Sequence, residues 1–311
     1  MSVRRIAIVG YGKIAQDQHA PSIAGNAAFE LAATISRGGS APDGISSFAN
    51  VADMVAVGLD IDAVAICTPP SVRYEVAREC LEAGLHTLLE KPPGMTLGEC
   101  EELARLAQEK GVTLFTTWHA QYNPAVSAAA ELLAGKRIAA MRIVWREDVR
   151  KWHPGQQWIW APGGFGVFDP GINALSIATR IFPGTLILRE AELFFPANRD
   201  TPIAASLAFS SPASGGALTA EFDWRHGGGE AWTIDIEIEG GETLQLADGG
   251  SRLLVGGEPR AGHGPGEYPA IYAHFAKLLR TGASHIDLAP LRLSADAFLL
   301  GRRTLVQTFE G

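Results

Sequence analysis

One lysine is marked out for chemistry by the residues around it. Lys91 follows a short apolar run, Leu85–Leu89, and the acid Glu90, and two prolines come directly after it. A proline restricts the residue before it to an extended backbone, so this side chain starts from a defined position. At the carboxyl end of a strand, such an ammonium group can reach a ligand and stabilise negative charge on it. The simpler interpretation is an exposed lysine in front of a proline turn.

A second candidate is an acid in a glycine-rich segment, residues 163–173. Asp169 precedes Pro170, which suits the start of a helix, and Asn173 lies one turn further on. The simplest role of Asp169 is therefore the N-cap of that helix. A carboxylate at a helix start can also face a cleft, and Asn173 can share its face of the helix.

Two further polar residues occur where apolar ones are expected. Glu147 continues the face of a strand that carries Met141, Ile143 and Trp145. An acid on such a face is unusual unless it has a partner. His119 follows an expected strand, residues 112–116, and would lie at the same ligand edge as Lys91. A single histidine is more often a packed or surface residue, so its position alone does not assign a role.

The start of the chain indicates a dinucleotide site. An apolar strand, residues 5–9, leads into Gly10-x-Gly12-x-x-Ala15 and a helix. The glycines permit a tight turn and close approach of a pyrophosphate, which the helix N-terminus can bind.

The second strand, residues 29–35, favours NADP over NAD. An acid that binds the ribose hydroxyls of NAD is expected near its end. The chain instead has Ser36 and Arg37, which can bind a 2′-phosphate. The alternative is that both are ordinary polar loop residues.

Composition limits the class of protein. The 311 residues are 47% hydrophobic and carry a net charge of −8, which favours a large packed core and disfavours nucleic acid or anionic membranes as partners. The three cysteines lack metal-binding spacing, so we predict no metal site and a reduced, cytoplasmic protein.

The order of predicted elements indicates two α/β domains. Strands and helices alternate through residues 1–121, which predicts a doubly wound parallel Rossmann sheet. Residues 122–311 carry several strands in series, which predicts a second α/β domain with an open, mainly antiparallel sheet. Two helices close the chain, at residues 271–279 and from Leu293 to about Phe309.

These motifs together resemble the glucose–fructose oxidoreductase / inositol dehydrogenase family. The resemblance covers the whole chain and rests on the glycine turn, Thr68-Pro69-Pro70, Glu90-Lys91-Pro92 and the segment 163–173. It implies a cis Lys91–Pro92 bond and a lysine that reaches nicotinamide and substrate. It also implies a homo-oligomer contact through the open sheet, which is frequent in the family. The cofactor residues that we predict are Gly10, Gly12, Lys13, Ile14, Ser36, Arg37, Thr68, Pro69, Glu90 and Lys91.

One departure from the family pattern narrows the resemblance. Many members have a histidine where this chain has Asn173. An amide cannot accept a proton at neutral pH, so Asp169 becomes the better base. This arrangement resembles the bacterial aldose 1-dehydrogenases that act on L-arabinose and D-galactose. In that branch, the positions that line the sugar site match Lys91, His119, Glu147, Trp152, Asp169, Asn173 and Trp232.

The resemblance implies a reaction with named roles. A pyranose is oxidised at its anomeric carbon to the lactone, with NADP preferred and NAD as the second cofactor. Lys91, Asp169 and Asn173 are the predicted catalytic residues. Asp169 takes the proton, and Lys91 as the proton acceptor is an alternative. His119, Glu147, Trp152 and Trp232 are predicted to bind the sugar. Two other functions stay open: a non-catalytic sugar-response sensor that binds NADP, and a dehydrogenase for another polyol or a diol.

Overall fold

The computed structural model describes residues 3–260 and 264–310. Its contacts divide the chain into two compact units. The first contains the residues up to His119 and the segment Pro265–Leu288; the second contains Ala120–Gly264 and the residues from Ala289 onward. The sequence predicts the boundary after residue 121, with this segment in the second domain. The segment belongs with the first unit because its helix α8 (Glu267–Thr281) stacks Phe275 on Phe29 and Phe115.

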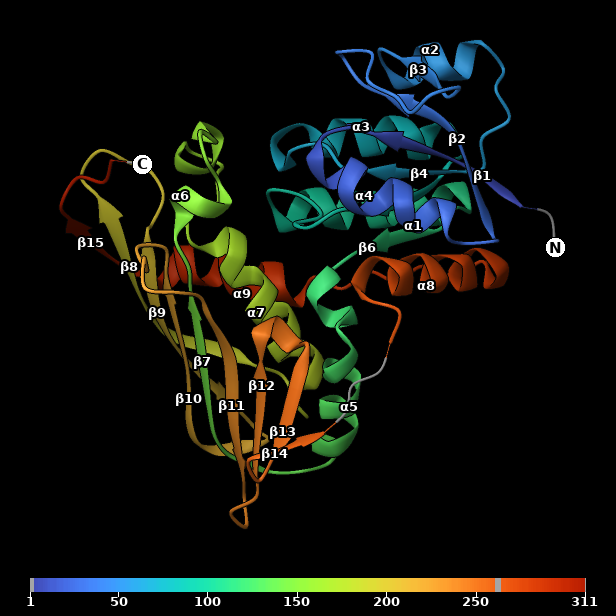
Figure 1. The fold of residues 1–311 in the computed structure, drawn as a ribbon. Helices are drawn as coiled ribbons and strands as arrows, with labels where there is room; N and C mark the ends of the chain where they lie inside the picture. The colour runs from blue at the N-terminus through green and yellow to red at the C-terminus, as the bar shows by residue number, and fades with distance from the viewer. Residues whose placement is uncertain (1–2, 261–263, 311) are drawn as a thin grey trace. The chain divides into compact units, whose positions relative to one another are not determined.

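The first unit is built on a six-stranded parallel sheet in the order β3-β2-β1-β4-β5-β6 (Figure 1). This is the Rossmann sheet that the alternation of elements predicts. Its strands are β1 (Arg4–Val9), β2 (Phe29–Ile35), β3 (Ser46–Phe48), β4 (Ala63–Ile66), β5 (His86–Leu89) and β6 (Leu114–Thr116). Its other helices are η1 (Ala15–His19), α1 (Ala20–Ala24), α2 (Val51–Ala56), α3 (Pro70–Glu82) and α4 (Leu97–Lys110).

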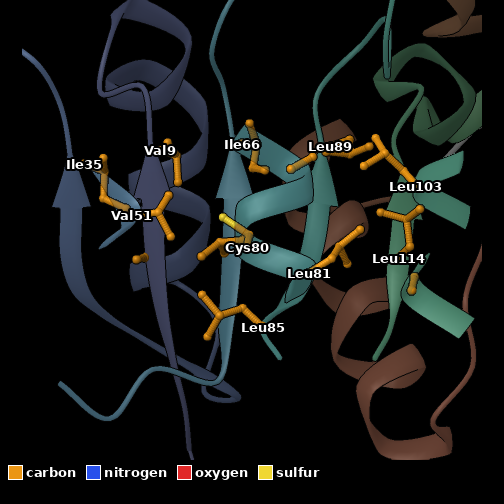
Figure 2. Packing of buried hydrophobic residues seen from close by; sticks show 14 of the residues in the cluster. Val9, Ile35, Val51, Ile66, Cys80, Leu81, Leu85, Leu89, Leu103 and Leu114 are labelled. Carbon is orange, nitrogen blue, oxygen red and sulfur yellow. The ribbon is translucent and has the colours of Figure 1, made fainter. Parts of the chain in front are cut away.

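The core of this unit lies between the sheet and its helices. Figure 2 shows Val9, Ile66 and Leu89 on neighbouring strands, beside Cys80 and Leu81 of α3. All five are buried, and their apolar surface supplies the main driving force for folding of the unit. Because β1, β4 and β5 are parallel, the residues that follow them come to the same edge of the sheet.

The second unit contains a mixed, mainly antiparallel sheet, as predicted. Among the described residues it has nine strands, in the order β14-β13-β12-β11-β7-β10-β9-β8-β15, with parallel pairs only at β7/β10 and β8/β15. The strands are β7 (Ile138–Arg146), β8 (Ile187–Pro196), β9 (Ala204–Ser211), β10 (Ser214–Asp223), β11 (Ala231–Ile238), β12 (Thr243–Ala247), β13 (Arg252–Val255), β14 (Glu258–Arg260) and β15 (Arg302–Val306).

Three helices pack on one face of this sheet. They are α5 (Pro124–Leu133), α7 (Phe168–Ile181) and α9 (Ala289–Leu300) (Figure 1). The strands also carry surface ion pairs, in which Arg142 and Arg146 of β7 contact Glu221 of β10. The remaining short helices are η2 (His119–Tyr122), α6 (Val149–Trp152), η3 (Gln157–Trp160) and η4 (Asp248–Gly250).

The predicted C-terminal helix is too long. Helix α9 ends at Leu300, and residues 302–306 form strand β15 instead. A side chain at Gly301 would lie 2.4 Å from the carbonyl oxygen of Ala297, so the chain turns closely there. Pairing with β8 then satisfies the backbone of β15, and tertiary pairing overrides the local helical pattern. Within the described residues, no helix is long and apolar enough to cross a membrane.

Candidate active site

The glycine turn after β1 has the geometry of a dinucleotide site. Gly10 has φ +86°, and a Cβ there would lie 2.9 Å from the backbone nitrogen of Thr68. Only glycine fits this position without strain. A Cβ on Gly12 would meet no atom within 4 Å, so that position opens toward the groove. The residues present therefore fit a pyrophosphate lying against the turn.

A groove of about 760 Å³ runs along this turn in the first unit. It is lined by eight of the predicted cofactor residues: Gly10, Gly12, Lys13, Ile14, Ser36, Arg37, Thr68 and Pro69. Glu90 and Lys91 are not among the described residues that line it. The groove therefore collects the end of β2 and the turns after β1 and β4, which is where a Rossmann fold binds its dinucleotide.

The two cations of the groove differ in their partners. The Lys13 ammonium pairs with Asp17 one turn along the helix. The exposed Arg37 guanidinium forms no hydrogen bond or ion pair with the described residues, and Ser36 beside it is half-buried. Arg37 is therefore the cation that can bind an anionic group of a ligand without breaking an existing ion pair.

The turn that carries Lys91 is tied to the dinucleotide turn by a buried arginine. Arg73 of α3 donates to the carbonyl oxygens of Thr68, Glu90 and Pro92. Its guanidinium thus joins the residues after β4 to those after β5. The Lys91–Pro92 peptide bond is cis, as predicted. Sequence reasoning did not identify Arg73, whose position inside a helix gives no local signal.

The carboxylate of Glu90 is buried and held by three donors. Its Oε2 accepts the backbone N–H of Lys91 at 2.7 Å. Its Oε1 accepts the Tyr268 hydroxyl at 2.7 Å and lies 3.1 Å from Nε2 of His19. Burial would raise the pKa of Glu90, but the hydrogen bond and charge of His19 outweigh it and hold the pKa well below its ordinary range. Glu90 therefore supports the Lys91 turn and does not line the predicted cofactor groove.

His119 is paired with the carboxylate of Glu267. Its Nδ1 lies 2.9 Å from Oε2 of Glu267, and its ring stacks on Tyr268 with centroids 5.9 Å apart. Burial would lower the pKa of His119, but the charge and hydrogen bond of Glu267 outweigh it and raise the pKa. Within the described part of the first unit, Nε2 has no hydrogen-bond partner, so it can bind a ligand hydroxyl.

In the second unit, Asp169 is not the helix cap that its sequence suggests. Helix α7 starts at Phe168 with Val167 at the N-cap, so Asp169 lies inside the first turn. Its side chain is buried, and Oδ2 lies 3.4 Å from Nε2 of His153. The cap prediction is wrong because Gly166, with φ +53° and in close contact with Pro202, starts the helix earlier. The carboxylate of Asp169 therefore faces His153 and does not cap the helix.

Asn173 lies one turn after Asp169 on α7, as predicted, and is half-buried. The hydroxyl of Ser176 donates to its backbone carbonyl, and no side-chain bond of Asn173 is found within the described residues. Its amide can therefore offer a donor or an acceptor to a ligand hydroxyl.

Glu147 is held by two indoles immediately after β7. The Nε1–H groups of Trp224 and Trp232 donate to its two carboxylate oxygens at 3.1 Å and 3.0 Å. This explains how an acid can continue an apolar face, because both oxygens are hydrogen-bonded. A carboxylate has about four acceptor positions, and these two bonds use two of them. Trp232 thus also positions Glu147.

Trp152 is half-exposed at the end of α6. Its ring centroid lies 5.7 Å from that of Trp232, and the Lys151 ammonium lies over its face at 4.8 Å. The exposed indole surface is available to the apolar face of a ring. The structure thus brings Glu147, Trp152 and Trp232 together and pairs Asp169 with His153, whose ring centroid lies 5.2 Å from that of Trp224.

Five polar residues around these groups were not predicted, and the causes differ. His153 follows Trp152 directly and could have been suspected from that neighbour. Glu267 and Tyr268 lie in the first turn of α8, which the sequence analysis began at residue 271; Pro269 was an available signal for an earlier start. His19 and Trp224 had no local signal, because their partners come from distant segments.

The fold and the groove define a Rossmann oxidoreductase that binds a nicotinamide dinucleotide. Residues 4–118 match the profile of the oxidoreductase family with an NAD-binding Rossmann fold. Over 98% of its length the chain is 44% identical to a galactose 1-dehydrogenase of Pseudomonas fluorescens, 98% of which is covered. The chain therefore belongs to the glucose–fructose oxidoreductase / inositol dehydrogenase family.

Solved structures agree with this assignment. A D-galactose-1-dehydrogenase protein from Rhizobium etli superposes with a TM-score of 0.95 at 48% identity, over 100% of this chain and 99% of that one. A 3-ketoreductase from Actinomadura kijaniata, solved with NADP, superposes with a TM-score of 0.81 at 17% identity, over 98% and 100% of the two chains. The second match shows the shared fold.

Proposed function

We propose that this protein is an NADP-preferring aldose 1-dehydrogenase that oxidises D-galactose and L-arabinose pyranoses to their lactones. The observation that carries the proposal is the match over nearly the whole chain to a galactose 1-dehydrogenase. The presence of Lys91, Asp169 and Asn173 in one chain supports it. D-Galactose and L-arabinose share the configuration of their ring hydroxyls and differ in one exocyclic group, so both are included.

The proposed chemistry separates hydride loss from proton loss. Bound NADP would accept the hydride from C1 of the sugar at its nicotinamide ring. Asp169 takes the proton of the anomeric hydroxyl, and the C1–O1 bond becomes the carbonyl of the lactone. A positioned base of this kind contributes a rate factor of about 10²–10⁴. Lys91 stabilises negative charge that develops on O1. His153, next to Asp169, orients that carboxylate.

The remaining predicted residues bind the sugar. Asn173 and His119 hold hydroxyl groups by hydrogen bonds, and Glu147 accepts from one or two others. Trp152 and Trp232 cover the apolar face of the ring. These assignments, like the boundary between the two domains, are proposals that follow from the resemblance and from the contacts described above.

The preference for NADP rests on Ser36 and Arg37 at the end of β2. Replacing Arg37 by Ala should raise the KM for NADP about 10- to 100-fold, since a hydrogen bond to a charged group contributes about 1.5–3 kcal/mol. The KM for NAD should stay nearly unchanged. Arg105→Ala is the matched control, because that exposed arginine lies on α4 and is not among the described residues that line the groove. Equal losses with both dinucleotides would contradict the 2′-phosphate role.

The substrate proposal is tested by initial rates at 340 nm with NADP and NAD. The sugar panel should contain D-galactose, L-arabinose, D-fucose, D-xylose, D-glucose and myo-inositol. We expect the first three to react fastest. Fast turnover of myo-inositol alone would favour the polyol alternative, and binding of NADP without turnover of any sugar would favour the sensor.

Location and assembly complete the proposal. The three cysteines, Cys67, Cys80 and Cys100, are free, which agrees with the predicted reducing cytoplasm. The face of the large sheet opposite α5, α7 and α9 is the proposed contact between subunits of a homo-oligomer. Light scattering of the purified chain tests this part.

A further inference from the structure

Two adjacent residues of one helix support the two residues of the first unit that we propose to act on the sugar, His119 directly and Lys91 through Glu90. Glu267 and Tyr268 form the first turn of α8. Glu267 holds His119, and Tyr268 holds Glu90, whose other oxygen holds the backbone of Lys91. The two residues lie about 150 to 180 positions further along the chain than their partners. Nothing in the dinucleotide-binding groove requires them.

The bond from Glu267 determines which nitrogen of His119 is available. A carboxylate only accepts, so Nδ1 of His119 carries the hydrogen of the 2.9 Å bond. The other nitrogen, Nε2, is then left for a sugar hydroxyl. The stacking of the imidazole on Tyr268, with planes 15° apart, fixes the plane of the ring. Glu267 and Tyr268 thus set both the tautomer and the orientation of His119.

The bond from Tyr268 completes the support of the Lys91 turn. Glu90 accepts from Tyr268 and His19 on one oxygen and from Lys91 N–H on the other. His19 is itself held from Nδ1 by the hydroxyl of Tyr272, one turn further along α8. The four side chains of this network, His19, Glu90, Tyr268 and Tyr272, are all buried. They therefore restrict movement of the backbone at Lys91.

We propose that Glu267 and Tyr268 are positioning residues for the oxidation, which set the proton of His119 and, through Glu90, the backbone of Lys91. The inference rests on the proposed function, because it takes His119 and Lys91 as the groups that act on the sugar. It adds two residues to the site that no motif of the sequence indicates.

The first test replaces Glu267 by Gln and follows kcat/KM for D-galactose from pH 5 to 9. The charged or titratable groups that face His119 are Glu267, Tyr268, Glu90 and Lys91. Loss of the Glu267 charge lowers the pKa of His119, so the inflection due to this histidine should move to lower pH by about one unit. A profile identical to that of the wild type would overturn the role of Glu267.

The matched control is Glu101→Gln. Glu101 is exposed on α4 of the same unit, and its replacement removes the same charge from a distant surface. It should leave the profile unchanged. An equal shift in this variant would assign the effect to net charge and contradict the proposal.

The second test replaces Tyr268 by Phe, which keeps the ring and removes one donor to Glu90. We expect kcat to fall about tenfold, since small displacements of a catalytic group are costly, while the dissociation constant of NADP stays the same. Tyr74→Phe, on α3 of the same unit, is the control. An unchanged kcat, or equal losses in kcat and NADP binding, would overturn the role of Tyr268.

A third measurement separates this inference from the proposed function. The His119 ring can be titrated by NMR in the wild type, after assignment with His119→Asn, and again in Glu267→Gln. A lower pKa in the variant supports the pair even if the wild type oxidises no sugar. Equal pKa values would overturn it even if the protein turns over D-galactose rapidly.

Discussion

Two buried glutamates, one in each unit, show two ways of holding a carboxylate. Glu90 in the first unit is bound by an imidazole, a phenol and a backbone amide, and Glu147 in the second unit by two indoles. The imidazole of His19 is a titratable group, whereas an indole is not. The support of Lys91 should therefore depend on pH through a partner of Glu90, whereas neither indole partner of Glu147 titrates.

The largest effect is expected at Asp169. This acid belongs to the second unit, like Glu147, but its partner is a histidine, His153, as for Glu90. Asp169→Asn should lower kcat about 10²- to 10⁴-fold, because the amide cannot accept the proton of the anomeric hydroxyl. The dissociation constant of NADP, measured by fluorescence, should not change. Asp200→Asn, an exposed acid of the same unit, is the control. Substantial residual turnover would move the proton transfer to Lys91.

Glu90→Gln should destabilise the protein by about 3 kcal/mol, since removing one partner of a buried pair leaves the other charge uncompensated. The measurement is urea unfolding of the variant and the wild type between pH 3 and 9.

The loss should depend on pH in a defined direction. The folded pKa of Glu90 lies below its ordinary 4.5, so its contribution is complete above pH 4.5 and declines as the pH falls. Burial lowers the pKa of His19, but Cys67, Tyr272 and Glu90 outweigh burial and raise it well above 6.5. The contribution of His19 is thus complete below pH 6.5 and declines as the pH rises through the folded value. A difference that is constant with pH would contradict the ion pair.

Glu147→Gln should cost less. The new amide can accept from one indole only, so one N–H loses its partner, at about 1–3 kcal/mol. Urea unfolding of the variant and the wild type at pH 7 measures this loss. The KM for D-galactose should rise as well, and an unchanged KM would remove Glu147 from the proposed sugar site.

Trp152→Ala should have the smallest effect on stability. The side chain is 46% exposed and sits at the edge of the aromatic group, so the loss should stay within about 1 kcal/mol. The KM for D-galactose should rise several-fold while kcat changes little, because stacking on the sugar ring is a uniform binding interaction. A loss of kcat equal to the change in KM would place Trp152 closer to the chemistry than proposed.

Local sequence patterns predicted the parts of the molecule that depend on neighbouring residues. The glycine turn and the alternation of strands and helices follow from residues close in the chain, and the cis bond after Lys91 was implied by the family resemblance. The hydrogen-bond partners of the buried acids cannot be predicted in this way. Tyr268 meets Glu90 across 178 positions, and Trp224 meets Glu147 across 77. Such contacts depend on how distant segments pair, and one sequence carries no periodic signal for them.

The errors have the same origin. Asp169 suits a helix cap by residue type, but contacts of Gly166 with Pro202 start α7 before it. Residues 302–306 read as helix, but pairing with β8 makes them a strand. In both places a contact with a distant segment outweighs a local preference.

The hydrogen bonds of Arg73 to three carbonyl oxygens have a consequence for redesign of the protein. They join the residues after β4 to the Lys91 turn, but Ser36 and Arg37 follow β2 and lie outside the joined segments. The residues proposed to select the cofactor and the lysine proposed to act in the reaction thus lie in separate segments at the same edge of the sheet. Ser36 and Arg37 could therefore be replaced by an acidic loop that accepts NAD, without changing the hydrogen bonds of Arg73 that hold the Lys91 turn.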